Sequence, residues 1–340
     1  MGMEYDIEQV KDAKVAIIGV GGGGNNAINR IIEDSVGDEN MKDVLFVAMN
    51  TDYRVLENSK AAVKIPLGEK LTGGYGCGAK PEVGKSAAEE SKEQIEAVLE
   101  GIDMVFITAG MGGGTGTGAA PVVAALAKKK DILTVAVVTK PFKFEGRKKM
   151  EAAEAGIQRL EENVDSLVVI PNENIFKLIK GSCQMSKAFG YVDCVLSNNV
   201  KGICDIITKR GAVNIDFADI KTIMKGRGIV HMGVGFGKGE NRFHDAMDQA
   251  IKNPLLETSI ANAKDVILNF YGDNIDVYQL NECAAFIANT VHPDADIIWG
   301  YREPEEGEEE TNFVQVTVIA ANFDSDSSQQ IPENGWAPIM

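Results

Sequence analysis

The sequence predicts an α/β protein built on a doubly wound, mostly parallel sheet, followed by a smaller second domain of helices and a mixed sheet. Three observations support this prediction. In the first half, short β-branched runs alternate with longer helical patterns, as in a parallel sheet with crossover helices. Two glycine-rich segments directly follow predicted strands. The length of 340 residues exceeds one typical domain, so a second unit is expected.

The expected elements of the first unit follow one another regularly. Buried strands are predicted at residues 14–20, 44–49, 104–108, 133–139 and 167–170. Helices between them are predicted at residues 26–32, 82–99, 119–130, 147–162 and 174–178. An apolar-rich stretch without proline at 185–209 then predicts a long helix across the middle of the molecule.

The second unit has a different order of elements. Its helices are predicted at 216–224 and 241–251, and its strands at 229–236, 266–271, 296–299 and 314–321. In residues 303–310 six of eight side chains are Glu, which favours a solvated hairpin loop because like charges repel. We therefore expect these divisions: an N-terminal extension at 1–13, a nucleotide-binding domain at 14–182, a central helix at 183–210, a second domain at 211–323 and a disordered tail at 324–340.

Charge and composition exclude several classes of protein. With 34 basic and 50 acidic residues the net charge is −16, which argues against nucleic acid or acidic lipid as a partner. The apolar runs are too short for a membrane span, and the acidic N-terminus is unlike a signal peptide. We therefore expect a cytoplasmic protein without membrane insertion. The five cysteines form no CxxC pair and the three histidines lie far from them, so neither a disulfide framework nor a protein-ligated metal is expected.

The first glycine-rich segment, residues 19–24, joins a predicted strand to a predicted helix. Its backbone N–H groups and the helix N-terminus can receive a phosphate. It also satisfies GxGxxG, so a Rossmann NAD(P) oxidoreductase is one alternative. That alternative needs an acidic residue for the ribose. Asp52 could serve, but it follows Gly19 by more than the roughly 20 residues that are usual.

A P-loop is a weaker interpretation of residues 79–86. Ala79 stands where the GxxxxGK[ST] pattern needs its first glycine, and no apolar strand precedes the segment. Pro81 instead predicts the first turn of a helix, with Lys85 on a solvated face.

The second glycine-rich segment, residues 110–118, is the most informative part of the sequence. Six of its nine residues are glycine. Because glycine costs backbone entropy on folding, so many glycines indicate that the backbone here must approach another group closely. One alternative is a turn that serves tight helix packing. The other is a second phosphate loop, and two such loops on neighbouring strand ends would hold a di- or triphosphate through N–H donors. An acidic protein can bind a nucleotide in this way.

Residues 112–118 resemble the signature of the tubulin/FtsZ superfamily of GTPases. Further segments are similar to its FtsZ branch in the same order: residues 19–27, 50–52, 76–88, 139–146, 211–224 and 253–256. The resemblance covers about residues 14–323. It implies an N-terminal GTP-binding domain, a central helix and a C-terminal domain with a mixed sheet. It also implies GTP or GDP as cofactor, with Mg²⁺ held mainly by phosphate and water oxygens.

The resemblance also implies a set of nucleotide-binding residues. These are Gly22, Gly23, Gly24, Asn25, Asn26, Ala79, Gly112, Gly113, Gly114, Thr115, Gly116, Thr117, Thr139, Pro141, Glu145, Lys149, Asn172, Phe189 and Asp193. Asp193 occupies the guanine-binding position, where a carboxylate can accept two hydrogen bonds, and Phe189 would pack on the base. Glu145 matches the acid at the ribose. Lys149 stands at the family's arginine, for which Arg147 is the other candidate.

Three polar residues in the second domain are candidate catalytic groups. Asp216 and Asp219 begin a predicted helix, where they could simply be an N-cap and a favourable first-turn acid. Together with Gly211 and Asn214 they are similar to the family's GxxNxDxxD loop. The resemblance then implies that this loop completes the site of a neighbouring subunit, so that hydrolysis depends on head-to-tail assembly.

The expected role is therefore a GTPase that polymerises head to tail and scaffolds the cell-division ring. Its main partner would be a second copy of itself. Ile331-Pro332 weakly matches the family's C-terminal peptide, which makes membrane-anchoring division proteins the other candidate partners at a division site. A GTP-binding structural polymer or regulator with little hydrolysis is the alternative, because Lys149 replaces an arginine and the tail is atypical.

Overall fold

The computed structural model describes residues 13–38, 41–179, 183–209, 211–256, 258–304 and 312–323. The expectations for residues 1–12 and 324–340, and for most of the glutamate-rich segment, concern residues outside this description.

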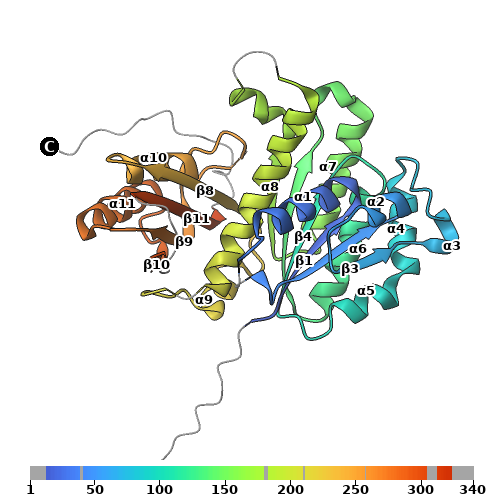
Figure 1. Cartoon of the computed structure of the whole chain (residues 1–340), viewed down its shortest axis with the longest axis horizontal. Helices are drawn as coiled ribbons and strands as arrows, with labels where there is room; N and C mark the ends of the chain where they lie inside the picture. The colour runs from blue at the N-terminus through green and yellow to red at the C-terminus, as the bar shows by residue number, and fades with distance from the viewer. Residues whose placement is uncertain are drawn as a thin grey trace, which may run out of the picture.

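The first unit is a seven-stranded parallel sheet in the order β3-β2-β1-β4-β5-β6-β7 (Figure 1). Its strands are β1 (Val15–Val20), β2 (Leu45–Asn50), β3 (Val63–Pro66), β4 (Met104–Gly110), β5 (Leu133–Lys140), β6 (Ser166–Pro171) and β7 (Gly228–Ile229). The five predicted strands are all present, which confirms the fold class. β3 and β7 were not predicted because they contain only four and two residues.

Helices cover both faces of this sheet. They are α1 (Gly21–Asp34), α2 (Tyr53–Glu57), α3 (Glu69–Thr72), α4 (Pro81–Glu90), α5 (Lys92–Val98), α6 (Thr115–Lys129), η2 (Lys143–Glu145), α7 (Arg147–Glu161) and η3 (Asn172–Lys177). Val15 and Ile17 belong to the core shared with α1, whereas Ala16 and Ile18 belong to the core shared with α4 to α7. This alternation explains why the strands are apolar at every position.

Four predicted helices differ from those observed. The helix predicted at 119–130 begins earlier, at Thr115, and the one predicted at 174–178 is the 3-10 helix η3. The helix predicted at 82–99 is divided into α4 and α5 at Ser91, whose Oγ accepts a hydrogen bond from the Gly68 N–H at 2.9 Å. The helix predicted at 26–32 begins earlier, because the glycine segment itself forms the first turn of α1.

The predicted long helix is α8 (Met185–Thr208), which lies between the two units (Figure 1). The second unit consists of α9 (Phe217–Met224), β8 (His231–Lys238), α10 (Arg242–Ile251), β9 (Ala263–Gly272), α11 (Val277–Thr290), β10 (Asp296–Arg302) and β11 (Phe313–Phe323). Its sheet has the order β10-β9-β11-β8. β9 and β10 are parallel and β11 is antiparallel to both β8 and β9, so the sheet is mixed.

The strand order corrects the prediction of a hairpin around residues 303–310. The strands on either side of this segment, β10 and β11, are not neighbours, since β9 lies between them. A glutamate-rich composition indicates a solvated connection, but it carries no information about which strands pair.

Within the described ranges, no helix is long and apolar enough to cross a membrane. In the same part of the chain, no three His, Cys, Asp or Glu side chains form a metal-ligating group.

Alternate glycines in β8 allow α10 to pack directly on the strand. A Cβ atom at Gly233, Gly235 or Gly237 would lie 1.8–1.9 Å from a backbone carbonyl oxygen of α10. Such a contact is impossible without moving the helix. The contact between backbones therefore depends on these three positions having no side chain.

We expect Gly235→Ala to lower the free energy of unfolding by about 3 kcal/mol, because the new methyl group displaces α10. Gly190→Ala in α8 is the control. A Cβ there meets no heavy atom within 4 Å, so this change should leave the stability equal or raise it by up to about 1 kcal/mol. Urea unfolding followed by circular dichroism measures both. Equal midpoints for Gly235→Ala and the wild type would contradict this account of β8.

Candidate active site

A cavity of about 450 Å³ lies at the carboxyl ends of β1, β4, β5 and β6. The side chains and backbone around it come from the segments that follow these strands, where an open α/β sheet places its ligand crevice. Fourteen of the predicted binding residues line it: Gly22, Gly23, Asn26, Gly113, Gly114, Thr115, Gly116, Thr139, Pro141, Glu145, Lys149, Asn172, Phe189 and Asp193.

Two helix N-termini without side-chain caps converge on this cavity. The residues before α1 and α6 are Val20 and Gly114, and neither makes a side-chain capping hydrogen bond in the described structure. Neither helix has an acidic residue in its first turn. Free N–H groups and the positive ends of both helix dipoles therefore face the same space, which is an arrangement that binds anions.

The glycines of the two loops bring their backbones close together. A Cβ at Gly23 would lie 3.2 Å from the backbone of Gly110, and one at Gly116 would lie 2.5 Å from the Gly110 carbonyl oxygen. A Cβ at Gly22 would meet nothing within 4 Å, so this position is open toward the cavity. Some of these glycines thus allow close packing of the two loops, whereas Gly22 leaves its backbone open to the cavity. The sequence left tight packing and phosphate binding as alternatives, and the structure is compatible with both, at different residues.

The other end of the cavity is built for a larger polar group. Phe189 and Asp193 project from the first turns of α8, and Phe189 packs edge-on against Phe142 with ring centroids 5.3 Å apart. Burial raises the pKa of Asp193 to about 6, although the charge of Arg30 opposes this shift. The Oδ1 atom of Asn172 is buried and accepts no hydrogen bond within the described structure. Because Asn172 lines the cavity, this oxygen is available to a hydrogen-bond donor of a bound molecule.

The structure distinguishes between Lys149 and Arg147. Lys149 lines the cavity, and its Nζ lies 3.0 Å from the Glu145 carboxylate. The side chain of Arg147 is 88% exposed, pairs with Glu151 at 3.2 Å and is not part of the cavity lining. Lys149 therefore holds the cationic position, as a point charge instead of the planar fork of an arginine.

Five predicted binding residues lie outside the lining of the cavity: Gly24, Asn25, Ala79, Gly112 and Thr117. Most of them hold the loops. A Cβ at Gly24 would lie 2.2 Å from the Thr108 carbonyl oxygen, and Asn25 donates a hydrogen bond to the Gly19 carbonyl. Thr117 accepts one from the Gly112 N–H at 2.8 Å. Ala79 is exposed and has a positive φ of 58°.

Four lining residues were not predicted: Gly110, Met111, Val192 and Leu196. Val192 and Leu196 lie on the same face of α8 as Phe189, at helical spacing. This spacing could have identified them from the sequence. Asp52, the acid of the Rossmann alternative, is not in the lining. It caps α2 through the Arg54 N–H at 3.0 Å and pairs with the Arg54 side chain at 3.2 Å.

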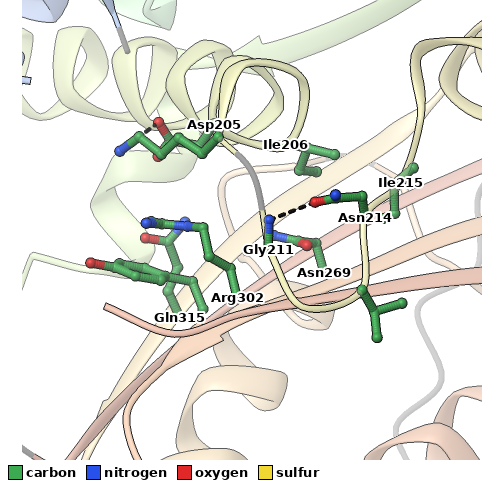
Figure 2. Close-up of a pocket in the computed structure, with 11 residues that line it drawn as sticks. Asp205, Ile206, Gly211, Asn214, Ile215, Asn269, Arg302 and Gln315 are labelled. Carbon is green, nitrogen blue, oxygen red and sulfur yellow. Dashed lines mark hydrogen bonds and ion pairs between the residues drawn. The ribbon is translucent and has the colours of Figure 1, made fainter. Parts of the chain in front are cut away.

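The loop before α9 lies beside a cleft formed by the end of α8 and the second sheet (Figure 2). The Gly211 N–H donates to Asn214 Oδ1 at 2.5 Å, and Val213 pairs with Tyr301 of β10. Asp216 accepts a hydrogen bond from the Asp219 N–H at 2.8 Å, and Asp219 accepts one from the Asp216 N–H at 3.2 Å. This reciprocal capping box is the structural role that the sequence left open.

Asp216 and Asp219 lie at the opposite edge of the first sheet from the cavity. From Asp193 to the end of α8 the chain runs through 15 helical residues, or about 22 Å. At the far edge, Lys225, which follows α9, pairs with Asp131 at 2.7 Å just before β5 begins. The two carboxylates therefore cannot reach the cavity of their own chain.

Comparisons with known proteins agree with this geometry. Residues 14–180 match the family model described as the GTPase domain of the tubulin/FtsZ family, and residues 228–324 match that of the FtsZ family C-terminal domain. The chain is similar to an empty FtsZ dimer from M. jannaschii, with 39% identity over 97% of this chain and 96% of the other, and a TM-score of 0.85. A mutant of FtsZ from the same organism has 41% identity over 92% of each chain and a TM-score of 0.84.

A GTPγS-bound CetZ2 protofilament from Haloferax volcanii shares 18% identity over 92% of this chain and 94% of the other, with a TM-score of 0.76, which indicates a common fold. The identity with FtsZ is much higher, at 39% and 41%, over a similar share of the chains. The chain therefore belongs to the FtsZ family and is a GTPase whose cofactors are GTP or GDP with Mg²⁺.

Proposed function

We propose that this GTPase polymerises head to tail and that each hydrolytic site is built from two subunits. The observation that supports this most strongly is the separation of the nucleotide cavity from Asp216 and Asp219 at opposite edges of one sheet. When complementary surfaces lie at opposite ends of a chain, their contact is heterologous, and it produces an open filament when successive copies do not close into a ring. The empty FtsZ dimer and the CetZ2 protofilament are relatives in which such chains associate.

In the proposed binding mode, the phosphates lie over the N-termini of α1 and α6 and the guanosine lies toward α8. Ionised Asp193 accepts hydrogen bonds from the guanine N1–H and amino group, and Phe189 packs on the base. Glu145 accepts from the ribose, and the unpaired Asn172 Oδ1 receives a donor from the nucleoside. Lys149 offsets the negative charge of Glu145, so that the pair does not repel the nucleotide. Residues 14–182 would thus form the binding domain.

Magnesium would neutralise charge on the β- and γ-phosphates. The carboxylates among the described lining residues, Glu145 and Asp193, belong to the nucleoside end of the cavity. The residues at the phosphate end are glycines and Thr115, which are N–H and hydroxyl donors. This donor set fits the phosphates themselves, and it leaves the metal to phosphate and water oxygens.

Asp216 and Asp219 would complete the site of the next subunit. If these carboxylates lay beside the phosphates within one chain, they would repel the nucleotide before assembly. In the proposed filament they come from the neighbouring subunit, so they approach the phosphates only after assembly. There they can orient and polarise a water molecule for attack on the γ-phosphate. Asn214 would support this arrangement through its hydrogen bond with the Gly211 N–H, which fixes the loop.

We also propose the cellular role of a division-ring scaffold in the cytoplasm, at the division site. The FtsZ assignment supports it, and the filament described above would supply the scaffold. Division proteins that anchor the filament to the membrane would bind residues 324–340, which lie outside the described structure.

The shared site predicts that GTP turnover per molecule depends on protein concentration. Below a threshold the two halves are separate, so specific activity should be close to zero; above it, activity should rise together with light scattering from filaments. Both signals can be recorded in one cuvette. A specific activity that is constant across the threshold would show that one chain contains the whole site.

Asp216→Asn separates capping from catalysis. Asparagine caps a helix about as well as aspartate, so folding and GTP binding should be retained. The variant loses the carboxylate charge, and turnover of assembled protein should fall by about 100-fold. Asp216→Ala is the comparison variant, since it loses the cap as well and should also be less stable by about 1 kcal/mol. Wild-type turnover in Asp216→Asn would leave this residue with a capping role alone.

Guanine binding should depend on the ionisation of Asp193. Because its pKa is raised to about 6, the carboxyl group becomes protonated as the pH falls through that value and loses an acceptor. GDP affinity should therefore decrease between about pH 7 and about pH 5, approaching tenfold per pH unit at the acid end. Calorimetric titration of Asp193→Asn should give weaker binding and a shallower profile, because only the titration of the terminal phosphate of GDP remains. The same slope in both proteins would exclude Asp193 as the titrating group.

A further inference from the structure

Two buried residues, Thr51 and Cys77, form a closed hydrogen-bonded ring with the half-buried Thr115 beside the cavity. The Oγ1 atoms of Thr51 and Thr115 are 2.7 Å apart. Cys77 Sγ lies 3.3 Å from Thr51 Oγ1 and 3.5 Å from Thr115 Oγ1. Thr51 and Cys77 are only 1% and 7% exposed, whereas Thr115 also lines the cavity. The ring joins three segments that are distant in the sequence.

Thr51 is held firmly in place by its neighbours. Asn50 Oδ1 accepts hydrogen bonds from the Thr51 N–H at 2.8 Å and the Asp52 N–H at 3.2 Å. Asn50 Nδ2 donates to Asn25 Oδ1 at 2.8 Å, and Asn25 Nδ2 donates to the Gly19 carbonyl at 2.8 Å. Asn25 and Asn50 are buried. This chain of hydrogen bonds ties the backbone of Thr51 to the first glycine loop.

Cys77 is held equally closely against the second glycine loop. A Cβ at Gly114 would lie only 2.5 Å from the Cys77 Cβ, so the cysteine occupies the space that a side chain at Gly114 would need. The Cβ atom of Cys77 therefore lies directly against the backbone of Gly114, the residue before Thr115.

The ring lies at the phosphate end of the cavity, far from the nucleoside residues. Thr51 directly follows β2, and Asn172 directly follows β6. In the order β2-β1-β4-β5-β6 these strands are four places apart, about 19 Å. With the nucleoside at Asn172 and Asp193, the group nearest to Thr51 and Thr115 is the last phosphate of the chain.

The ring also determines where the Thr115 proton can go. Each of the three groups carries one proton, so the closed ring has Cys77 donating to Thr51, Thr51 to Thr115, and Thr115 to Cys77. The last bond is the longest and uses sulfur, a weak acceptor. A phosphate oxygen is a far stronger acceptor. When one is present, the Thr115 hydroxyl can turn into the cavity while the other two bonds remain.

We propose that Thr51 is a positioning residue that orients the Thr115 hydroxyl toward the terminal phosphate and thereby favours GTP over GDP. By donating to Thr115 Oγ1, Thr51 leaves the Thr115 proton free for the ligand. This inference rests on the proposed nucleotide site, and it adds a selectivity for the third phosphate that the glycine loops alone do not supply.

The test is the ratio of GTP affinity to GDP affinity, measured with Mg²⁺ on the full chain below the concentration at which scattering rises. Thr51→Val should lower this ratio about fivefold, because the hydrogen bond that orients Thr115 is lost. Thr51→Ser keeps the hydroxyl and should stay within about twofold of the wild type. Thr134→Val is the control, because it removes a buried hydroxyl that donates to the Ile132 carbonyl at the start of β5, the end of that strand opposite to the cavity. It should leave the ratio unchanged.

Cys77→Ser supplies a second, directional test. The serine hydroxyl oxygen is a stronger acceptor than a thiol sulfur, so the Thr115 hydroxyl should keep donating to residue 77 instead of to the phosphate. The ratio of GTP affinity to GDP affinity should therefore also fall. Melting curves of all variants verify that the protein is folded.

A ratio that is unchanged in Thr51→Val, or an equal loss of GTP and GDP, would overturn the role of Thr51 while leaving the nucleotide site intact. A wild-type chain that binds neither nucleotide would instead contradict the proposed site, and the inference with it.

Discussion

The length and rigidity of α8 separate the two halves of the proposed active site. The helix begins beside the nucleotide cavity, with Phe189 and Asp193 in its first turns, and ends beside the loop that carries Asp216. Its buried face packs Leu196, Val200 and Ile203 into the core under the first sheet. At its far end, Lys209 binds both Asp38 at 2.8 Å and Asp205 at 3.1 Å, which fixes that end to the segment after α1. A helix packed along its buried face and paired at its far end keeps Asp216 away from the cavity of its own chain.

The negative charge of the molecule constrains how it can bind a nucleotide. A chain with a net charge of −16 repels a triphosphate at long range, so the binding energy must come from short-range donors. The uncapped N-termini of α1 and α6 supply these donors, and the glycines let the two backbones approach each other. In the proposed binding mode, the ring of Thr51, Cys77 and Thr115 would add one oriented hydroxyl at the end of the phosphate chain. Asp216 and Asp219 would approach the phosphates only through the proposed assembly.

Much of the first unit could be predicted because its signals are local. Apolar runs marked the central strands, and the glycine loops carried their chemistry within a few residues. Non-local features were missed. β3 and β7 are too short to show a pattern, and α11 was missed because it buries few of its apolar residues, Cys283 and Ile287. The hairpin prediction was wrong because strand order depends on tertiary packing.

The candidate site shows the same division. Lys149 and Arg147 are two positions apart in sequence, and only the observed start of α7 decides which one faces the cavity. Thr51 and Cys77 were not predicted as site residues, because they meet Thr115 only in the folded chain. The capping box between Asp216 and Asp219 was anticipated, and it leaves their catalytic role to an experiment on assembled protein.

Mixing two inactive variants is the most direct test of a site shared between subunits. Asp216→Asn retains the nucleotide cavity, whereas Gly22→Asp retains the loop and places a carboxylate at the phosphates, at a position where a new Cβ meets no atom within 4 Å. If each site is shared, an equal mixture should recover about one quarter of wild-type GTP turnover, since a random filament pairs an intact cavity with an intact loop at that fraction of its contacts. A mixture that co-sediments as filaments but hydrolyses no more GTP than either variant alone would contradict the account.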